Sequence, residues 1–261
     1  MTKGIIYYTD NRADERINRR VRAQLLSIGL PITSVSLQPV PNFGRNIVLP
    51  LERGMLTMFT QILTALENAK EDIIFFCEHD VLYHPSHFDF TPSTRDTFYY
   101  NVNVWKVRAE DGHAVWVDNC QQVSGICVYR EDAIKHYRER IQFTKDGTWT
   151  RGKGFEPGHK QHRLPWTHKF LVETWMSAWP NLDIRYNHNL TANRWSTDKF
   201  RDKSTCQNWT ETTSVPYWGT FSLDDDTTTP MASPSPTPAP DRKSTRLNSS
   251  HSQQSRMPSS A

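Results

Sequence analysis

An apolar run that ends in three ionisable residues constrains the fold of this chain more than any other feature of its sequence. Residues 73–77 (IIFFC) are followed directly by Glu78, His79 and Asp80. A short apolar run bounded by polar residues is typical of a buried strand. Because carboxylates and imidazole are costly to bury, their position after such a strand indicates a functional site at the edge of a sheet.

The segments before this run alternate between strand and helix patterns. In order, they are a strand at 4–11, a helix at 12–29, a strand at 32–40, a loop at 41–50 and a helix at 53–70. In the first helix Ile17, Val21 and Leu25 recur every four residues and form one apolar stripe. This β-α-β-loop-α-β order favours an α/β fold with an open sheet and helices on its faces.

The later part of the chain continues this pattern. Strands are expected within 97–107 and 113–130, a helix at 130–141 and a strand at 182–186. The sequence has no GxGxxG after the first strand and no GxxxxGK[ST], so neither a Rossmann-type dinucleotide site nor a P-loop is supported.

Composition indicates a cytoplasmic protein with a sizeable core. The 261 residues are 36% hydrophobic and include nine Trp. No apolar run approaches the roughly 18 residues of a membrane span, and the N-terminus has no apolar segment of signal-peptide length. Four Cys without a CxxC pair favour reduced thiols over disulfides or zinc. The net charge of +3 is only a weak preference for anionic ligands.

The composition changes near residue 220. From residue 222 onward there is no aromatic residue, and six of the sixteen prolines lie there. Such a segment cannot bury enough apolar surface to offset its chain entropy. We therefore predict a single domain at 1–220 and a disordered tail at 221–261. The final stretch, RKSTRLNSSHSQQSRMPSSA, resembles translated sequencing-adapter sequence, so part of the tail is expected to be non-native.

Polar residues follow two of the expected strands at the same edge of the sheet. They are Thr9 to Arg12 after the first strand and Glu78 to Asp80 after residues 73–77. Acids at such an edge can bind Mg²⁺ or Mn²⁺, which usually also take phosphate ligands. Arg12 and Arg45 are candidates to contact the same phosphates, since guanidinium groups match phosphate geometry. The alternatives are a solvated strand end and an Arg12–Asp10 ion pair.

Several motifs together resemble a known enzyme family. They are YYTDNR, ERGMLTMF, FCEHDVLYHPSHFDF, QVSGICVYR, GFEPG and NLTANRW, spread over about residues 4–218. This part of the chain resembles GT-A glycosyltransferases, and most closely small, uncharacterised GT-A-like proteins of phages and bacteria. The resemblance implies a GT-A (Rossmann-like) open mixed sheet with helices on both faces. It also implies transfer of a sugar from a nucleoside-diphosphate sugar, with Mn²⁺ or Mg²⁺ as cofactor.

The resemblance also suggests which residues form the donor site. Asp80 takes the place of the last acid of the family's DxD motif, and Glu78 replaces the first Asp. The implied metal ligands are Asp80 and a late histidine, His188. Glu78 is expected to contact the ribose. The nucleobase falls on Thr9, Asp10 and Arg12, at the end of the first strand.

The resemblance leaves the catalytic base and the acceptor open. An inverting enzyme needs a carboxylate that deprotonates the acceptor, whereas a retaining enzyme does not. Glu173, expected at the start of a late helix, competes for this role with Asp118 and Glu156. The acceptor is left open among a glycan, a small molecule and a modified DNA base.

Two other functions also fit the sequence. Basic residues interleaved with Trp, as in KQHRLPW and NRWSTDKFRDK, are typical of modules that bind nucleic acid. The second alternative is an inactive GT-A-like domain that binds ligands without catalysing a reaction. The basic loop at 144–163 is expected to cover the acceptor side of the site, or to be a disordered surface loop.

Overall fold

Two parallel strands, β1 (Lys3–Thr9) and β4 (Ile73–Glu78), lie at the centre of the structure and are buried on both faces. The computed structural model describes residues 1–186, 193–199 and 208–224. Alternate residues of β1 enter two different apolar clusters, with Ile5 and Tyr7 in one and Ile6 and Tyr8 in the other. This period of two is what a strand buried on both faces requires.

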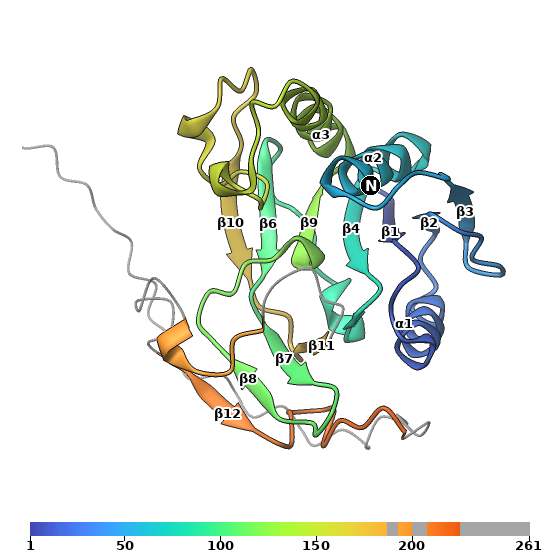
Figure 1. Ribbon diagram of the computed structural model, residues 1–261, viewed down its shortest axis with the longest axis vertical. Coiled ribbons are helices and arrows are strands. Elements are labelled where there is room, and N and C mark those ends of the chain that lie inside the picture. Colours follow the sequence, from blue (N-terminus) through green and yellow to red (C-terminus); the bar gives the residue numbers. More distant parts are fainter. Residues whose placement is uncertain (187–192, 200–207, 225–261) are drawn as a thin grey trace, which may run out of the picture. The chain divides into compact units, whose positions relative to one another are not determined.

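The central strands belong to a seven-stranded sheet in the order β10-β6-β9-β4-β1-β2-β3 (Figure 1). Its other strands are β2 (Ile32–Ser36), β3 (Arg45–Val48), β6 (Thr97–Asn101), β9 (Ile126–Tyr129) and β10 (Leu171–Trp175). In this sheet β9 is antiparallel to both neighbours, and the other pairs are parallel. The strand order reverses at β1, which has β2 on one side and β4 on the other.

Helices cover both faces of this sheet. The stripe of α1 (Glu15–Ser27) packs in the cluster that contains Tyr7 and Phe75. The apolar sides of α2 (Met55–Asn68) and α3 (Arg130–Lys145) pack in the other cluster, with Tyr8 and Phe76. The predicted α/β fold, an open mixed sheet with helices on both faces, is therefore confirmed.

A second sheet has the strand order β12-β8-β7-β11-β5. Its strands are β5 (Val81–Leu82), β7 (Val104–Arg108), β8 (Ala114–Trp116), β11 (Asn181–Arg185) and β12 (Thr210–Thr212). Short 3₁₀ helices occur at Pro85–His87, Val123–Gly125, Arg151–Lys153, Gln161–Arg163 and Thr197–Lys199. Because β5 follows β4 after only two residues, Glu78 at the end of β4 and Asp80 just after it lie where the two sheets meet.

Two local expectations were wrong. The loop expected at 41–50 contains β3, an edge strand paired with β2. The helix expected to begin near Glu173 is β10, which pairs in parallel with β6. Both are edge strands that are largely exposed, so they lack the buried apolar pattern by which inner strands are recognised.

The packed region continues past residue 220. Phe221 is only 5% exposed and belongs to the core cluster of β1 and α1. The guanidinium of Arg20 lies 4.9 Å from the centre of the Phe221 ring, and Arg16 forms an ion pair with Asp224 at 2.7 Å. Residues 221–224 therefore pack against α1.

Two further observations concern the described residues alone. No helix among them is both long and apolar enough to span a bilayer. Cys77, Cys120 and Cys127 are free thiols, and Cys77 and Cys127 are buried.

Candidate active site

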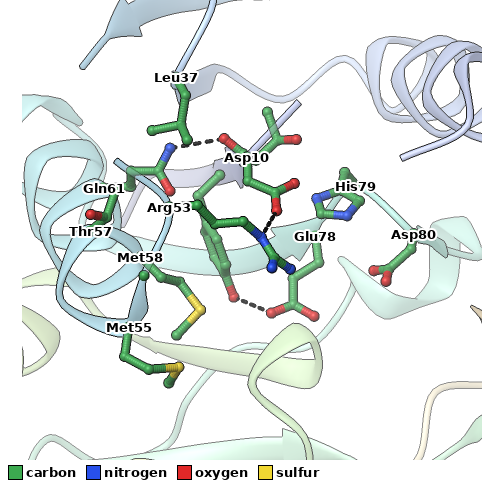
Figure 2. A pocket seen from close by; sticks show the side chains of 13 residues that line it. Asp10, Leu37, Arg53, Met55, Thr57, Met58, Gln61, Glu78, His79 and Asp80 are labelled. Carbon is green, nitrogen blue, oxygen red and sulfur yellow. Dashed lines mark hydrogen bonds and ion pairs between the residues drawn. The ribbon is translucent and has the colours of Figure 1, made fainter. Parts of the chain in front are cut away.

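A pocket lies at the carboxyl ends of β1 and β4, where the strand order reverses. Its volume is about 220 Å³, and it is lined by residues from the ends of these strands and the first two turns of α2 (Figure 2). In open α/β sheets such a reversal leaves a crevice between neighbouring strand ends, where ligands bind. The strand topology thus accounts for the position of the pocket.

The end of β1 is held in place by side chains from other elements. The buried Gln61 of α2 donates from Nε2 to the carbonyl of Thr9 at 2.8 Å. Asn11 has a left-handed backbone conformation (φ 60°), and its Oδ1 accepts from the amides of Leu37 and Gln38, both at 2.9 Å. These contacts fix the chain reversal that brings Asp10 into the pocket lining.

Asp10 forms an ion pair with an arginine that we did not predict from the sequence. Nε of Arg53, just before α2, lies 2.5 Å from Oδ2 of Asp10. Burial acts to raise the pKa of Asp10, but the hydrogen bond from Arg53 and the nearby His79 hold it below its usual value. The side chain of Arg53 is 42% exposed, so its guanidinium is accessible to a ligand. A base directly before an amphipathic helix was the available sequence signal.

Glu78, the last residue of β4, is hydrogen-bonded within the pocket. The hydroxyl of Tyr8 donates to its Oε1 at 2.6 Å, and its backbone amide donates to the hydroxyl of Tyr83 at 2.9 Å. Burial raises the pKa of Glu78, and the neighbouring Asp80 raises it further. Glu78 therefore favours its protonated form, in which it can donate a hydrogen bond to a ligand.

Asp80 lies at the junction of the two sheets, beside β11. Its carbonyl accepts from the amide of Ile184 at 2.8 Å. Burial acts to lower the pKa of Arg185, but the carboxylates of Asp183 and Asp80 more than offset this effect and raise it. Nε2 of His79 lies 3.2 Å from the hydroxyl of Tyr186. Arg185 at the end of β11 and Tyr186 directly after it thus lie beside Asp80 and His79 of the pocket lining, and sequence analysis did not identify either of them.

The described residues do not form a complete metal site by themselves. Among them, no three His, Cys, Asp or Glu side chains are grouped so as to hold a metal ion. Glu78 favours the protonated form and is bonded to Tyr8, so it is a poor ligand. Asp80 is the remaining acid on this side of the pocket lining. His188, the second predicted ligand, lies outside the described residues. One carboxylate fits a Mg²⁺ or Mn²⁺ ion that takes most of its other ligands from phosphates and water.

The structure brings together four of the predicted donor-site residues. Thr9, Asp10, Glu78 and Asp80 all line the pocket. Arg12 is exposed just outside it, and its backbone amide donates to Asp10 at 3.1 Å.

The predicted phosphate contact by Arg45 is not supported by its position. Arg45 begins β3, which runs parallel to β2 and β1, so it lies at the opposite edge of the sheet from the pocket. Its guanidinium donates to the carbonyl and side chain of Asn68 at 3.1 and 3.0 Å. Arg53 lines the pocket, as we had expected of Arg45.

The three predicted bases lie in different surroundings. Glu173 is exposed on β10, three strands from β4 and thus about 14 Å away. Asp118 follows β8 and bonds to Asn208, in the segment that leads to the start of β9. Glu156 is half-buried, and its charge acts on the buried Arg140. Because β9 starts at the edge where β4 ends, Asp118 is on the chain segment that approaches the pocket.

Two of the tryptophans that lie among basic residues, Trp149 and Trp166, do not form a stacking surface. Trp149 and Trp166 are 6% and 7% exposed and belong to the core cluster of α2 and α3. Modules that bind single-stranded nucleic acid present exposed aromatic rings to the bases. The buried positions of these two rings weigh against that alternative.

Comparison with known proteins does not identify a family for this chain. No protein-family model matches the sequence, and no curated protein sequence matches it. Among solved structures, the chain resembles a glycosyltransferase involved in glycosylation of the major capsid of PBCV-1. The TM-score is 0.44 and the identity 9%, over 70% of this chain and 92% of that one.

Two further structures show weaker similarity. The bifunctional IspDF of Campylobacter jejuni matches with a TM-score of 0.36 and 11% identity, over 68% of this chain and 50% of that one. A mutant Drosophila β1,4-galactosyltransferase 7, in complex with manganese, UDP-Gal and xylobiose, matches with a TM-score of 0.33 and 14% identity. The match covers 57% of this chain and 63% of that one. These similarities are too distant to assign an activity, so the residues of the site carry the proposal that follows.

Proposed function

We propose that this protein is a metal-dependent glycosyltransferase that moves a sugar from a nucleoside-diphosphate sugar to an acceptor. The observation that carries the proposal is the position of the pocket. It lies at the reversal of strand order, and residues with acidic, basic and hydrogen-bonding side chains line it together. Clefts with a few convergent polar groups at such reversals are the usual ligand sites of α/β sheets.

The pocket suits the nucleoside part of such a donor. Its volume of about 220 Å³ is below the roughly 300–1,000 Å³ typical of whole ligand sites. A base and ribose would fill it, and the diphosphate would then extend along the rim towards Asp80. Met55 and Met58 provide an apolar wall for the base, and protonated Glu78 is placed to donate to a ribose oxygen.

Arg53 and Asp80 are the residues we assign to the diphosphate. Arg53 would exchange its bond with Asp10 for the stronger attraction of phosphate oxygens. Asp80 would hold Mn²⁺ or Mg²⁺ together with those oxygens. The bound ion supplies neutralisation of the diphosphate as it leaves. Arg185, adjacent to Asp80, adds a fixed positive charge on the same side.

The reaction joins an acceptor hydroxyl oxygen to the anomeric carbon of the donor sugar. The bond from that carbon to the diphosphate breaks, and its electron pair leaves with the phosphate oxygen. The proton of the acceptor hydroxyl passes to a base. Asp118 and Glu156 are our candidates for the base in an inverting reaction, and Glu173 is disfavoured by its place on β10.

The test is a thermal-shift and hydrolysis screen with nucleoside diphosphates and nucleotide sugars, each with and without Mn²⁺. We expect one nucleotide to raise the melting temperature only when metal is present, and its sugar conjugate to hydrolyse slowly. Asp80→Asn should abolish the metal-dependent shift, whereas the exposed Asp89→Asn should not alter it. Arg53→Ala should weaken nucleotide binding about tenfold or more.

The matched control for Arg53→Ala is Arg45→Ala. Arg45 has the same side chain but lies at the far edge of the sheet, so nucleotide affinity should be unchanged. If no nucleotide shifts the melting temperature with any metal, the proposal is wrong. Nucleotide binding with no hydrolysis or transfer would favour the inactive binding domain instead.

A further inference from the structure

The pocket contains a buried amide that the proposed function does not use. Gln61, in the second turn of α2, is 3% exposed and lines the pocket. Its Nε2 donates to the carbonyl of Thr9 at 2.8 Å and lies 3.5 Å from the carbonyl of Val35. Because only the amide nitrogen can donate to carbonyls, these two contacts define which end of the amide is the oxygen.

The amide oxygen of Gln61 is free to accept a hydrogen bond. Among the described residues, no donor forms a hydrogen bond to its Oε1. Figure 2 shows the amide nitrogen on its hydrogen bond and the oxygen turned away from it. The neighbouring lining residues Leu37 and Met58 have apolar side chains, which offer the oxygen no donor. A buried acceptor of this kind costs stability unless water or a ligand supplies a hydrogen, so a ligand with a donor at this point gains affinity.

Gln61 and Asp80 lie on opposite sides of β1 in the pocket lining (Figure 2). The carbonyls that Gln61 contacts belong to Thr9, the last residue of β1, and to Val35 in β2. Asp80 follows β4, which pairs with the other side of β1. Because neighbouring strands are about 4.8 Å apart, β2 and β4 are about 10 Å apart. A nucleotide whose diphosphate lies beside Asp80 therefore extends its base towards Gln61.

We propose that Gln61 reads the nucleobase of the donor, with Oε1 accepting a hydrogen bond from an N–H group on the edge of the base. This inference rests on the proposed binding of a nucleoside diphosphate. Ribose hydroxyls also donate hydrogen bonds, but the ribose lies between the base and the diphosphate, beside Glu78. A pocket built to accept from an N–H group discriminates strongly against a base that lacks it, because the buried oxygen is then left unpaired. Gln61 is therefore a specificity-determining residue of the pocket.

The test compares UDP, CDP, ADP and GDP with counterparts in which every N–H group of the base is methylated, such as N3-methyl-UDP. Dissociation constants are measured by calorimetry with Mn²⁺ present. We expect the wild-type protein to bind at least one of the four diphosphates about tenfold or more tightly than its methylated counterpart. That ratio of dissociation constants is the readout for the variants.

Gln61→Ala removes the acceptor and leaves room for the methyl groups, so the ratio should fall to about twofold or less. The matched control is Asn11→Ala, because Asn11 also holds the end of β1, through the amides of Leu37 and Gln38. The control should weaken both ligands together and keep the wild-type ratio, as loss of a merely structural contact would. Melting curves show whether each variant is folded. If Gln61→Ala does not fold, Gln61→Met, which keeps the length of the side chain without the acceptor, is measured in its place with the same expected loss of the ratio.

The outcomes separate this inference from the proposed sugar transfer. A wild-type protein that binds a diphosphate and its methylated counterpart equally overturns the role of Gln61 and leaves sugar transfer standing. A wild-type ratio that persists without the Gln61 acceptor overturns that role as well. Equal loss of the ratio in Asn11→Ala shows that Gln61 only holds β1 in place, and also overturns it. If none of the four diphosphates binds with Mn²⁺, the proposed function itself is wrong.

Discussion

Tyr8 and Glu78 show how one buried hydrogen bond fixes the floor of the pocket. They are on neighbouring strands and pair in register across β1 and β4. Burial, with Glu78 close by, raises the pKa of Tyr8, so the phenol keeps its proton and donates a hydrogen bond to the carboxyl group. Each side chain is the hydrogen-bond partner of the other at a position from which water is largely excluded. The pair therefore matters for stability as well as for ligand binding.

Removing the hydroxyl of Tyr8 should destabilise the protein. We expect Tyr8→Phe to lower the free energy of unfolding by about 1–3 kcal/mol, since a polar atom of Glu78 loses its buried partner. Tyr137→Phe is the matched control, because the Tyr137 hydroxyl is buried with no hydrogen-bond partner among the described residues. It should be neutral or slightly stabilising. Urea denaturation of both variants checks this, and equal losses would contradict it.

At the scale of elements, the sequence predicts inner strands and amphipathic helices far better than edge strands. The run at 73–77 and the stripe of α1 have periods that burial dictates, so β4 and α1 were predictable. β3 and β10 are the end strands of the sheet, so each pairs with only one neighbouring strand. Their residues are mostly exposed and follow no burial pattern. The acids of the site were predictable because carboxyl ends of parallel strands share an edge. Excluding Arg45 as a phosphate contact required knowing that it begins β3, which places it at the edge of the sheet away from the pocket.

α3 contains a buried polar stripe that its sequence did not reveal. Asp132, His136 and Arg140 recur every four residues and are each 1% exposed. The ring of His136 stacks on Trp166 with centres 4.6 Å apart, and neither ring nitrogen has a hydrogen-bond partner among the described residues. Burial, and then the charge of Arg140, lowers the pKa of His136. The histidine is therefore neutral in the folded protein.

This neutral histidine should make stability depend on pH. A group whose pKa is lower in the folded state stabilises the fold above its unfolded pKa of about 6.5, and this is lost as pH falls. We expect each such histidine to lower the free energy of unfolding from pH 7 to pH 5 by up to about 1.4 kcal/mol per pH unit, whereas Glu78, whose pKa is raised, adds stability over the same range. His87, whose pKa burial lowers to about 3, acts in the same direction as His136.

The variant His136→Phe isolates the contribution of His136 to this pH dependence of stability. Phenylalanine keeps a ring against Trp166 and cannot take up a proton, so the variant should lose less stability between pH 7 and pH 5 than the wild type does. His162→Gln, an exposed change in the connection between α3 and β10, should leave the pH dependence unaltered. Denaturation curves at several pH values give the comparison. An unchanged slope in His136→Phe would show that His136 is not the titrating group.

For the whole molecule, the question is where the folded domain ends. Composition alone places the boundary at residue 220, because it detects the loss of aromatic residues but not the packing of the last one. Phe221 packs in the core beneath Arg20 of α1. The left-handed Gly112 (φ 72°) also approaches this segment closely, and a Cβ there would lie 2.6 Å from the carbonyl of Phe221. Residues 221–224 thus complete a contact between α1 and the second sheet's β7–β8 turn.

Two shortened chains test this boundary. A chain that ends at Asp224 keeps Phe221 and the Arg16–Asp224 ion pair, so its melting temperature should equal that of the full chain within about 1 °C, since surface ion pairs and the segment beyond contribute little. A chain that ends at Gly219 exposes the core surface beneath Phe221, at a cost of about 2 kcal/mol, and should melt about 5 °C lower. Phe221→Ala in the full chain should reproduce most of that decrease, because the ring accounts for it. If both shortened chains melt with the full chain, Phe221 adds nothing to the core; if both melt lower, residues beyond 224 belong to the fold.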